Sequence, residues 1–118
     1  MEWKEITSYY SEIRRHYNGK YLEKSYLLDD VVEIQIYSAY DEELDYTNEI
    51  FVTCKEFYGS TYPSEKPYEV YEQMKKDLYE GRLNGPYTKD FINKFVKKYD
   101  LCIAFDSYFS GFEKLFME

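Results

Sequence analysis

Apolar residues near the N-terminus recur at the spacing of a helix. Five of them follow one another at three- and four-residue steps: Trp3, Ile6, Tyr10, Ile13 and Tyr17. One apolar face at this period is typical of an amphipathic helix. We therefore predict a helix over about residues 2–17, which ends at Asn18-Gly19.

Two further helices are predicted in the second half of the chain. Ser64 is a suitable N-cap, and Pro67 fits the first turn of a helix that runs to about Tyr79. Thr88 caps the next helix, whose apolar side chains are expected to face inward. The spacing from Ser110 to Glu113 matches a capping box, which predicts a short closing helix near the end of the chain.

Alternation of apolar and polar residues predicts two strands, over 31–40 and 49–57. An acidic turn over 41–45 would join them as a hairpin. The face opposite the core should look outward in a half-solvated sheet, and it carries Glu33, Gln35, Tyr37, Phe51, Thr53 and Lys55. Residues 21–28 fit either a short strand or an irregular crossing. Residues 101–105 are apolar on both faces, which favours a central strand.

These elements predict one α+β domain over residues 1–118. Its expected architecture is a small, mainly antiparallel sheet with helices packed on one face. The expected order is α-β-β-α-α-β, followed by the short C-terminal helix.

Negative charge is concentrated in residues 29–58. This segment holds nine acidic residues and one base, Lys55, so it carries a formal charge of −8. The other 88 residues contain equal numbers of acidic and basic side chains. Tyrosines lie among the acids, and the whole chain has 16 of them. Such a segment repels nucleic acid and anionic membranes and attracts basic protein surfaces.

Few residues fit catalytic or metal-binding patterns. The single histidine, His16, follows two arginines and is a poor base. Cys54 and Cys102 are 48 positions apart and read as buried thiols, with a bridge between neighbouring strands as the alternative. Alternating acids from Asp41 resemble a calcium loop, but tyrosine stands at the glycine position and valine at the closing glutamate. We expect no cofactor and no metal.

The sequence therefore favours a non-enzymatic acidic binding protein. We expect it to inhibit a basic, nucleic-acid-acting protein, such as a nuclease, by occupying its phosphate-binding surface, as immunity proteins or phage anti-defence proteins of the nucleic-acid-mimic type do. The candidate partner-binding residues are Asp29, Asp30, Glu33, Tyr37, Tyr40, Asp41, Glu42, Glu43, Asp45, Tyr46 and Glu49.

Two alternatives stay open at this point. A structural or adaptor module, or a homodimer, would use a tyrosine-rich surface while the acids serve solubility. An enzyme would need two carboxylates with separated pKa values in one pocket. The residues at the N-terminus do not match a secretory leader, and the apolar runs are short, so we expect a cytoplasmic protein that contacts neither membrane nor nucleic acid.

Overall fold

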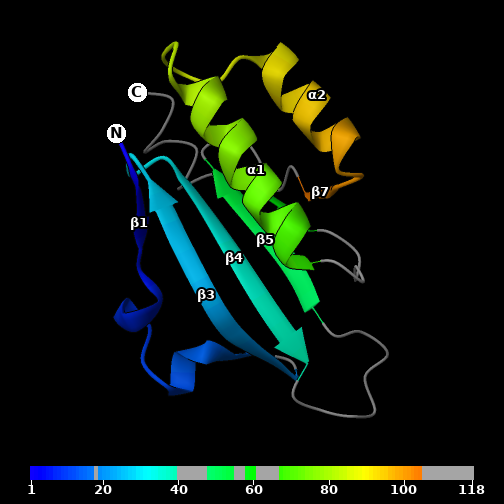
Figure 1. The fold of residues 1–118 in the computed structure, drawn as a ribbon. Helices are drawn as coiled ribbons and strands as arrows, with labels where there is room; N and C mark the ends of the chain where they lie inside the picture. The colour runs from blue at the N-terminus through cyan, green and yellow to red at the C-terminus, as the bar shows by residue number, and fades with distance from the viewer. Residues whose placement is uncertain (18, 40–47, 55–57, 61–66, 105–118) are drawn as a thin grey trace.

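In the computed structural model, the structure describes residues 1–17, 19–39, 48–54, 58–60 and 67–104. Within these ranges, the chain forms one antiparallel sheet, two α-helices and two short 3-10 helices (Figure 1). The strands are β1 Trp3–Glu5, β2 His16–Tyr17, β3 Lys20–Leu28, β4 Val32–Ala39, β5 Asn48–Cys54, β6 Tyr58–Ser60 and β7 Cys102–Ala104. The helices are α1 Pro67–Arg82 and α2 Lys89–Lys98, and the 3-10 helices are η1 Thr7–Tyr9 and η2 Ile13–Arg15.

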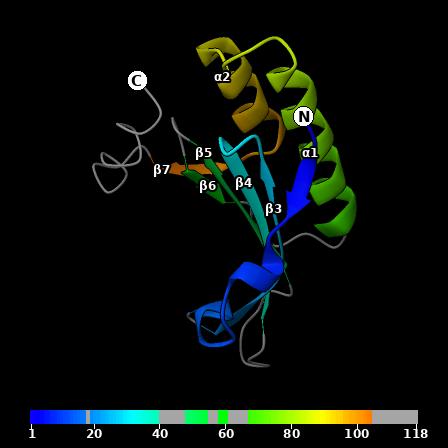
Figure 2. The same cartoon turned by 90° about the vertical axis from the view of Figure 1, so that its left-hand side faces the viewer.

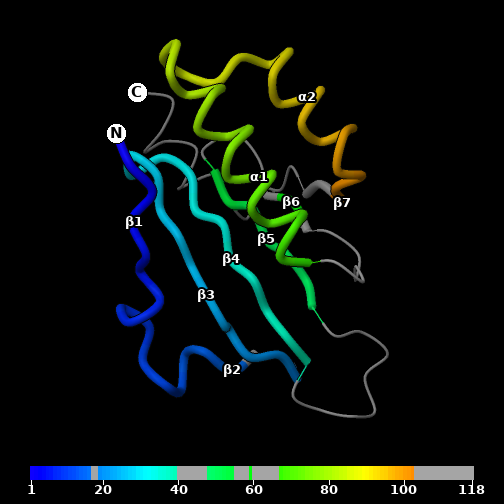
Figure 3. Tube along the Cα trace, in the orientation of Figure 1, coloured from blue at the N-terminus to red at the C-terminus, as the bar shows by residue number. Residues whose placement is uncertain are grey.

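The strands lie in the order β1-β3-β4-β5-β6-β7, with β2 paired to β3 as well (Figure 3). Both α-helices cover one face of this sheet, which we call the helix face (Figure 2). The helix face of β4 and β5 packs against α1 through a hydrophobic core. Its fully buried members include Val32, Ile34, Ile36, Ile50, Val52, Tyr71, Met74 and Leu78.

The predicted helix over residues 2–17 is wrong. Residues Trp3–Glu5 instead pair with β3 as strand β1, and the chain then passes through η1 and η2. Of the five residues predicted to share one buried face, Ile6 is 6% exposed but Ile13 is 86% exposed, so no such face exists. Thr7 and Ser11 also accept hydrogen bonds from backbone N–H groups, an alternative to helical bonding that is common for these residue types.

The predicted order α-β-β-α-α-β is therefore wrong as well. Six strands precede α1, and the region left undecided at 21–28 belongs to the longest of them, β3. The last strand, β7, was expected to be central, but it pairs with β6 at the end of the described strand order. A small α+β fold remains, with a different order of elements.

Several local predictions are confirmed. The strands predicted at 31–40 and 49–57 correspond to β4 Val32–Ala39 and β5 Asn48–Cys54, which are antiparallel and bury their alternating apolar residues. Residues 40 and 55–57 lie outside the described residues. Thr88 caps α2, since its Oγ1 accepts a hydrogen bond from the Phe91 N–H at 3.1 Å. The Ser64 cap and the closing helix after Ser110 lie outside the described residues.

The two cysteines differ in environment. Cys54 is buried, as expected, but Cys102 is exposed, because β7 lies at the edge of the described sheet. No disulfide joins these two described residues. In the part of the chain that the structure describes, we find no helix with the length and apolar composition needed to cross a bilayer.

Candidate functional site

The N-terminal segment after β1 folds against the face of the sheet opposite the helices, which we call the far face (Figure 2). Arg15 holds this segment in shape. Its guanidinium donates to the Thr7 carbonyl at 3.0 Å and to the Tyr10 carbonyl at 3.2 Å, and it contacts the Tyr21 hydroxyl at 3.5 Å. Five donors in a rigid plane allow one arginine to bind several acceptors at once. Arg15 therefore fixes the backbone that carries Tyr10.

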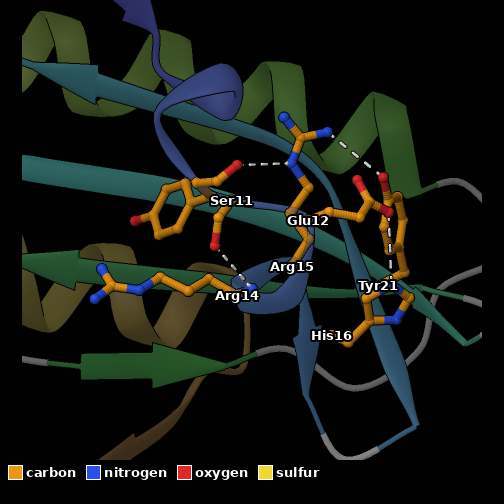
Figure 4. Close-up of polar contacts among 7 residues, drawn as sticks. Ser11, Glu12, Arg14, Arg15, His16 and Tyr21 are labelled. Atoms are coloured by element: carbon orange, nitrogen blue, oxygen red, sulfur yellow. Dashed lines mark hydrogen bonds and ion pairs between the residues drawn. The ribbon is translucent and has the colours of Figure 1, made fainter.

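Close contacts within the segment support the same geometry (Figure 4). The Arg14 N–H donates to Ser11 Oγ at 3.4 Å, and His16 Nε2 lies 3.6 Å from Glu12 Oε1. The His16 ring also lies against the Tyr21 ring, with 5.0 Å between centroids. These contacts are structural, and they join η2 to the start of β3.

Four side chains form a hydrogen-bonded cluster on the far face. The Tyr10 hydroxyl donates to Glu33 Oε2 at 2.6 Å, and Ser25 Oγ donates to the same oxygen at 2.9 Å. Gln35 Nε2 donates to the Tyr10 hydroxyl oxygen at 3.2 Å. Burial, followed by the hydrogen bond to Glu33, raises the pKa of Tyr10 well above its usual range. The phenol therefore remains a donor at all physiological pH values.

A pocket of about 310 Å³ lies beside this cluster. The strand register explains its base, because Leu27, Glu33 and Thr53 are directly opposite one another on β3, β4 and β5. We call it the Tyr10–Glu33 pocket, and its described walls are Tyr10, Leu27, Asp30, Val31, Glu33, Gln35 and Thr53. It combines apolar side chains with several hydrogen-bond acceptors.

The candidate acids of the described chain have different surroundings. Glu33 accepts the two hydroxyl hydrogen bonds, whereas Glu49 forms an ion pair with Lys20 at 2.8 Å. Asp29 lies 3.4 Å from the Nε of Arg82 in α1. Asp30 is exposed at the turn and reaches the pocket. The remaining acids, Asp41, Glu42, Glu43 and Asp45, lie outside the described residues.

The structure does not bring the described acids together as one array. Asp29 and Asp30 occupy the turn before β4, and Glu49 lies at the other end of β4, opposite Tyr37. Tyr37 is five positions after Val32, about 17 Å along the strand, so Glu49 lies well away from the two aspartates. Asp29 and Asp30 have φ values of 54° and 53°. A type I′ turn needs this left-handed geometry at both central residues, and aspartate tolerates it. The turn therefore explains why aspartate occupies both positions.

The candidate tyrosines are only partly described. Tyr37 packs edge-on against Phe51, with 5.1 Å between ring centroids, and both lie on the far face. Phe51 was expected to look outward, but it is buried, and the Lys20 ammonium lies 5.0 Å from its ring centroid. Tyr40 and Tyr46 lie outside the described residues. The far face therefore has its own packed cluster rather than an open polar surface.

A second pocket, of about 350 Å³, lies between α1 and α2, with Gly81, Phe91 and Phe95 among its walls. Asp77, one of two acidic residues in its walls, already accepts hydrogen bonds from Gln73, Lys98 and Tyr99. The Asp77 carboxylate is thus bonded to side chains of α1, of α2 and of the residue that caps α2. These contacts account for the packing of the two helices, and they give no support for a ligand site in this pocket.

Sequence reasoning missed Tyr10, Ser25, Gln35 and Thr53 as site residues. Gln35 and Thr53 were assigned to the correct face by the alternation of β4 and β5, but nothing local indicated that Tyr10 would lie above them. Ser25 is fully buried in β3, but it follows Glu23 and Lys24 in the sequence, so nothing local indicated a polar cluster there. No family model, no curated protein and no solved structure matches the chain.

Proposed function

We propose that the protein is a non-enzymatic acidic binding protein that inhibits a basic, nucleic-acid-acting protein. It would do so by occupying the partner's phosphate-binding surface, in the manner of an immunity protein or a phage anti-defence protein. The single observation that carries the proposal is the charge of the connection between β4 and β5. Its eight residues contain four carboxylates, from Asp41, Glu42, Glu43 and Asp45, and no base.

The strand register supports the concentration of this charge. Ser38 is paired with Asn48, so the connection leaves and re-enters the sheet at one end. Its four carboxylates are therefore attached to the same end of the sheet by short lengths of chain. Glu49 adds less to this field, because Lys20 neutralises it in a pair whose side chains are only 15% and 18% exposed. The proposal thus depends chiefly on the four acids of the connection.

The expected chemistry is competition for a basic surface. A groove that binds phosphates is lined by lysine and arginine, and a dense group of carboxylates competes for the same cations. Opposite fields also accelerate association, and screening by salt slows it. Tyr37, Tyr40 and Tyr46 flank the four acids in sequence and would add contact area of the kind common at the centre of interfaces.

The test is a capture experiment with two variants of equal charge. One replaces Asp41, Glu42, Glu43 and Asp45 by Asn or Gln. The control replaces four exposed acids elsewhere, Glu2, Glu72, Glu80 and Asp100, in the same way. Each purified protein is used to capture partners from an extract at low salt, and a 20-base-pair DNA duplex is then used to displace them.

We expect the wild type and the control to retain a basic protein that DNA and high salt release. The connection variant should bind that purified partner at least about a hundredfold more weakly, since each close charge pair contributes about 1.5 kcal/mol or more. Equal affinity of the two variants, or a partner that DNA does not displace, would exclude the proposal.

A second candidate function is a structural or adaptor module, or a homodimer, that uses a tyrosine-rich surface. The specific observation is that Tyr9 and Ile13, 65% and 86% exposed, lie in the same N-terminal segment. This candidate expects a dimer in light scattering that Ile13→Asp dissociates. A monomer at all concentrations would exclude the homodimer.

A further inference from the structure

The described walls of the Tyr10–Glu33 pocket supply several hydrogen-bond acceptors and no cationic side chain. Asp30 and Glu33 contribute carboxylates, and among the described residues that line the pocket none is Lys, Arg or His. Leu27 and Val31 add an apolar wall. The pocket is therefore complementary to a cationic group that carries several donors on an aliphatic stem.

Hydrogen bonds hold the Glu33 carboxylate in a defined orientation. Both described donors, Tyr10 and Ser25, bind Oε2, so Oε1 accepts no hydrogen bond from the described residues. Gln35 is oriented too, because its Nε2 donates to Tyr10, and its amide oxygen remains an acceptor. Acceptors that are fixed before a ligand arrives lose little conformational entropy on binding.

We propose that the Tyr10–Glu33 pocket binds the guanidinium group of an arginine side chain. The acceptors are distributed over β4, β5 and the turn before β4 rather than converging on one point. A planar group with five donors suits this distribution better than a lysine ammonium, whose three donors share one nitrogen. Leu27 and Val31 would cover the methylene stem, and the Tyr10 ring, as one wall, is a suitable neighbour for a cation.

The inference that this arginine belongs to the basic partner protein rests on the proposed function. A basic phosphate-binding surface presents arginines, and one of them would enter this pocket while others meet the acids between β4 and β5. The pocket itself is tested without that partner, so each idea can fail separately.

The probe is Nα-acetyl-L-arginine methylamide, titrated into the isotopically labelled wild-type protein and followed by NMR. The citrulline analogue is the matched control, because it has nearly the same shape and no charge. We expect saturable shifts at Tyr10, Glu33 and Gln35, with affinity for the citrulline analogue at least about tenfold weaker and for the lysine analogue several-fold weaker. Equal affinities for arginine and citrulline, or shifts spread over all acidic residues, would overturn the inference.

Substitutions of Glu33 and Tyr10 test whether the arginine analogue binds in this pocket. Glu33→Gln keeps the side-chain shape and should weaken arginine binding about tenfold, whereas Glu72→Gln, which removes an exposed charge on α1, should leave it unchanged. Tyr10→Phe removes the hydroxyl that orients Glu33 and provides a second measurement if Glu33→Gln alters the spectrum as a whole. Unchanged arginine affinity in a folded Glu33 or Tyr10 variant would disprove the assignment. Loss of partner capture in the connection variant would then still support the proposed function.

Discussion

Asp77 on α1 forms hydrogen bonds that join this helix to the C-terminal end of α2. Gln73 Nε2 donates to Oδ1 at 3.0 Å, Lys98 Nζ lies 2.7 Å from Oδ2, and the Tyr99 hydroxyl donates to Oδ2. Burial alone would raise the pKa of Asp77, but these hydrogen bonds lower it below the ordinary 3.8. The charged form is therefore the one that the fold stabilises.

We predict that Asp77→Asn lowers the free energy of unfolding by about 1–2 kcal/mol at pH 7. Because the native pKa is depressed, this contribution is present above the unfolded pKa and disappears as the pH falls through the native one. Urea titrations of both proteins from pH 7 to pH 2 should thus converge below about pH 4. Asp90→Asn is the control, since its pair with Lys94 is about three-quarters exposed and should contribute much less. A difference that persists at pH 2 would contradict the electrostatic origin.

Acidic residues of similar sequence context have three different roles. Glu33 belongs to a hydroxyl cluster, Glu49 to an ion pair and Asp29 to a left-handed turn beside Arg82. Composition establishes that residues 29–58 are acidic, but it contains no information on which cation or hydroxyl each carboxylate meets. Those partners, Tyr10, Lys20 and Arg82, come from distant segments. This is why the sequence indicated Asp30 and Glu33 as site residues but not the pocket that contains them.

Element prediction succeeded where the local pattern agreed with the tertiary environment. The alternation in β4 and β5 and the Thr88 cap of α2 need only neighbours in sequence. The helix predicted for the N-terminal segment was wrong because tryptophan, isoleucine and tyrosine, the residues at helical spacing, are also favoured in strands. Trp3–Glu5 forms a strand because it pairs with β3. The sequence near Trp3 contains no information about that pairing, because β3 lies farther along the chain.

The contact of α1 with α2 depends on Gly81. A Cβ at this position would lie 2.4 Å from Phe91 Cε2, and Phe91 is held between the stacked rings of Tyr87 and Phe95. We predict that Gly81→Ala destabilises the protein by about 1 kcal/mol, because overpacking exceeds the gain in helix propensity. Glu80→Ala, at the next exposed position, should change the stability by less than about 0.5 kcal/mol. Chemical denaturation measures both, and a stabilised Gly81→Ala would mean that the Phe91 ring can move aside.

At the scale of the whole molecule, Trp3 connects the beginning of the chain to the helix layer. Its Nε1 donates to the Lys75 carbonyl of α1 at 3.0 Å, and its ring packs on the hydrophobic core. The Lys75 ammonium lies 3.7 Å from the centroid of the Tyr26 ring, so β3 and α1 are joined at the same place. Strand β1, although only three residues long, therefore contacts both layers of the fold.

This arrangement predicts that β1 unfolds together with the rest of the protein. Trp3 is the chain's one tryptophan, so its fluorescence reports β1 alone, whereas far-UV circular dichroism reports all elements. Urea transitions followed by the two methods should have the same midpoint and slope, as for a two-state domain. Tyr9→Ser, at an exposed position in η1, is the control and should leave both curves in place. A fluorescence midpoint at lower urea would show that the N-terminal segment detaches first, and Tyr10 would then leave the Glu33 cluster before the sheet unfolds.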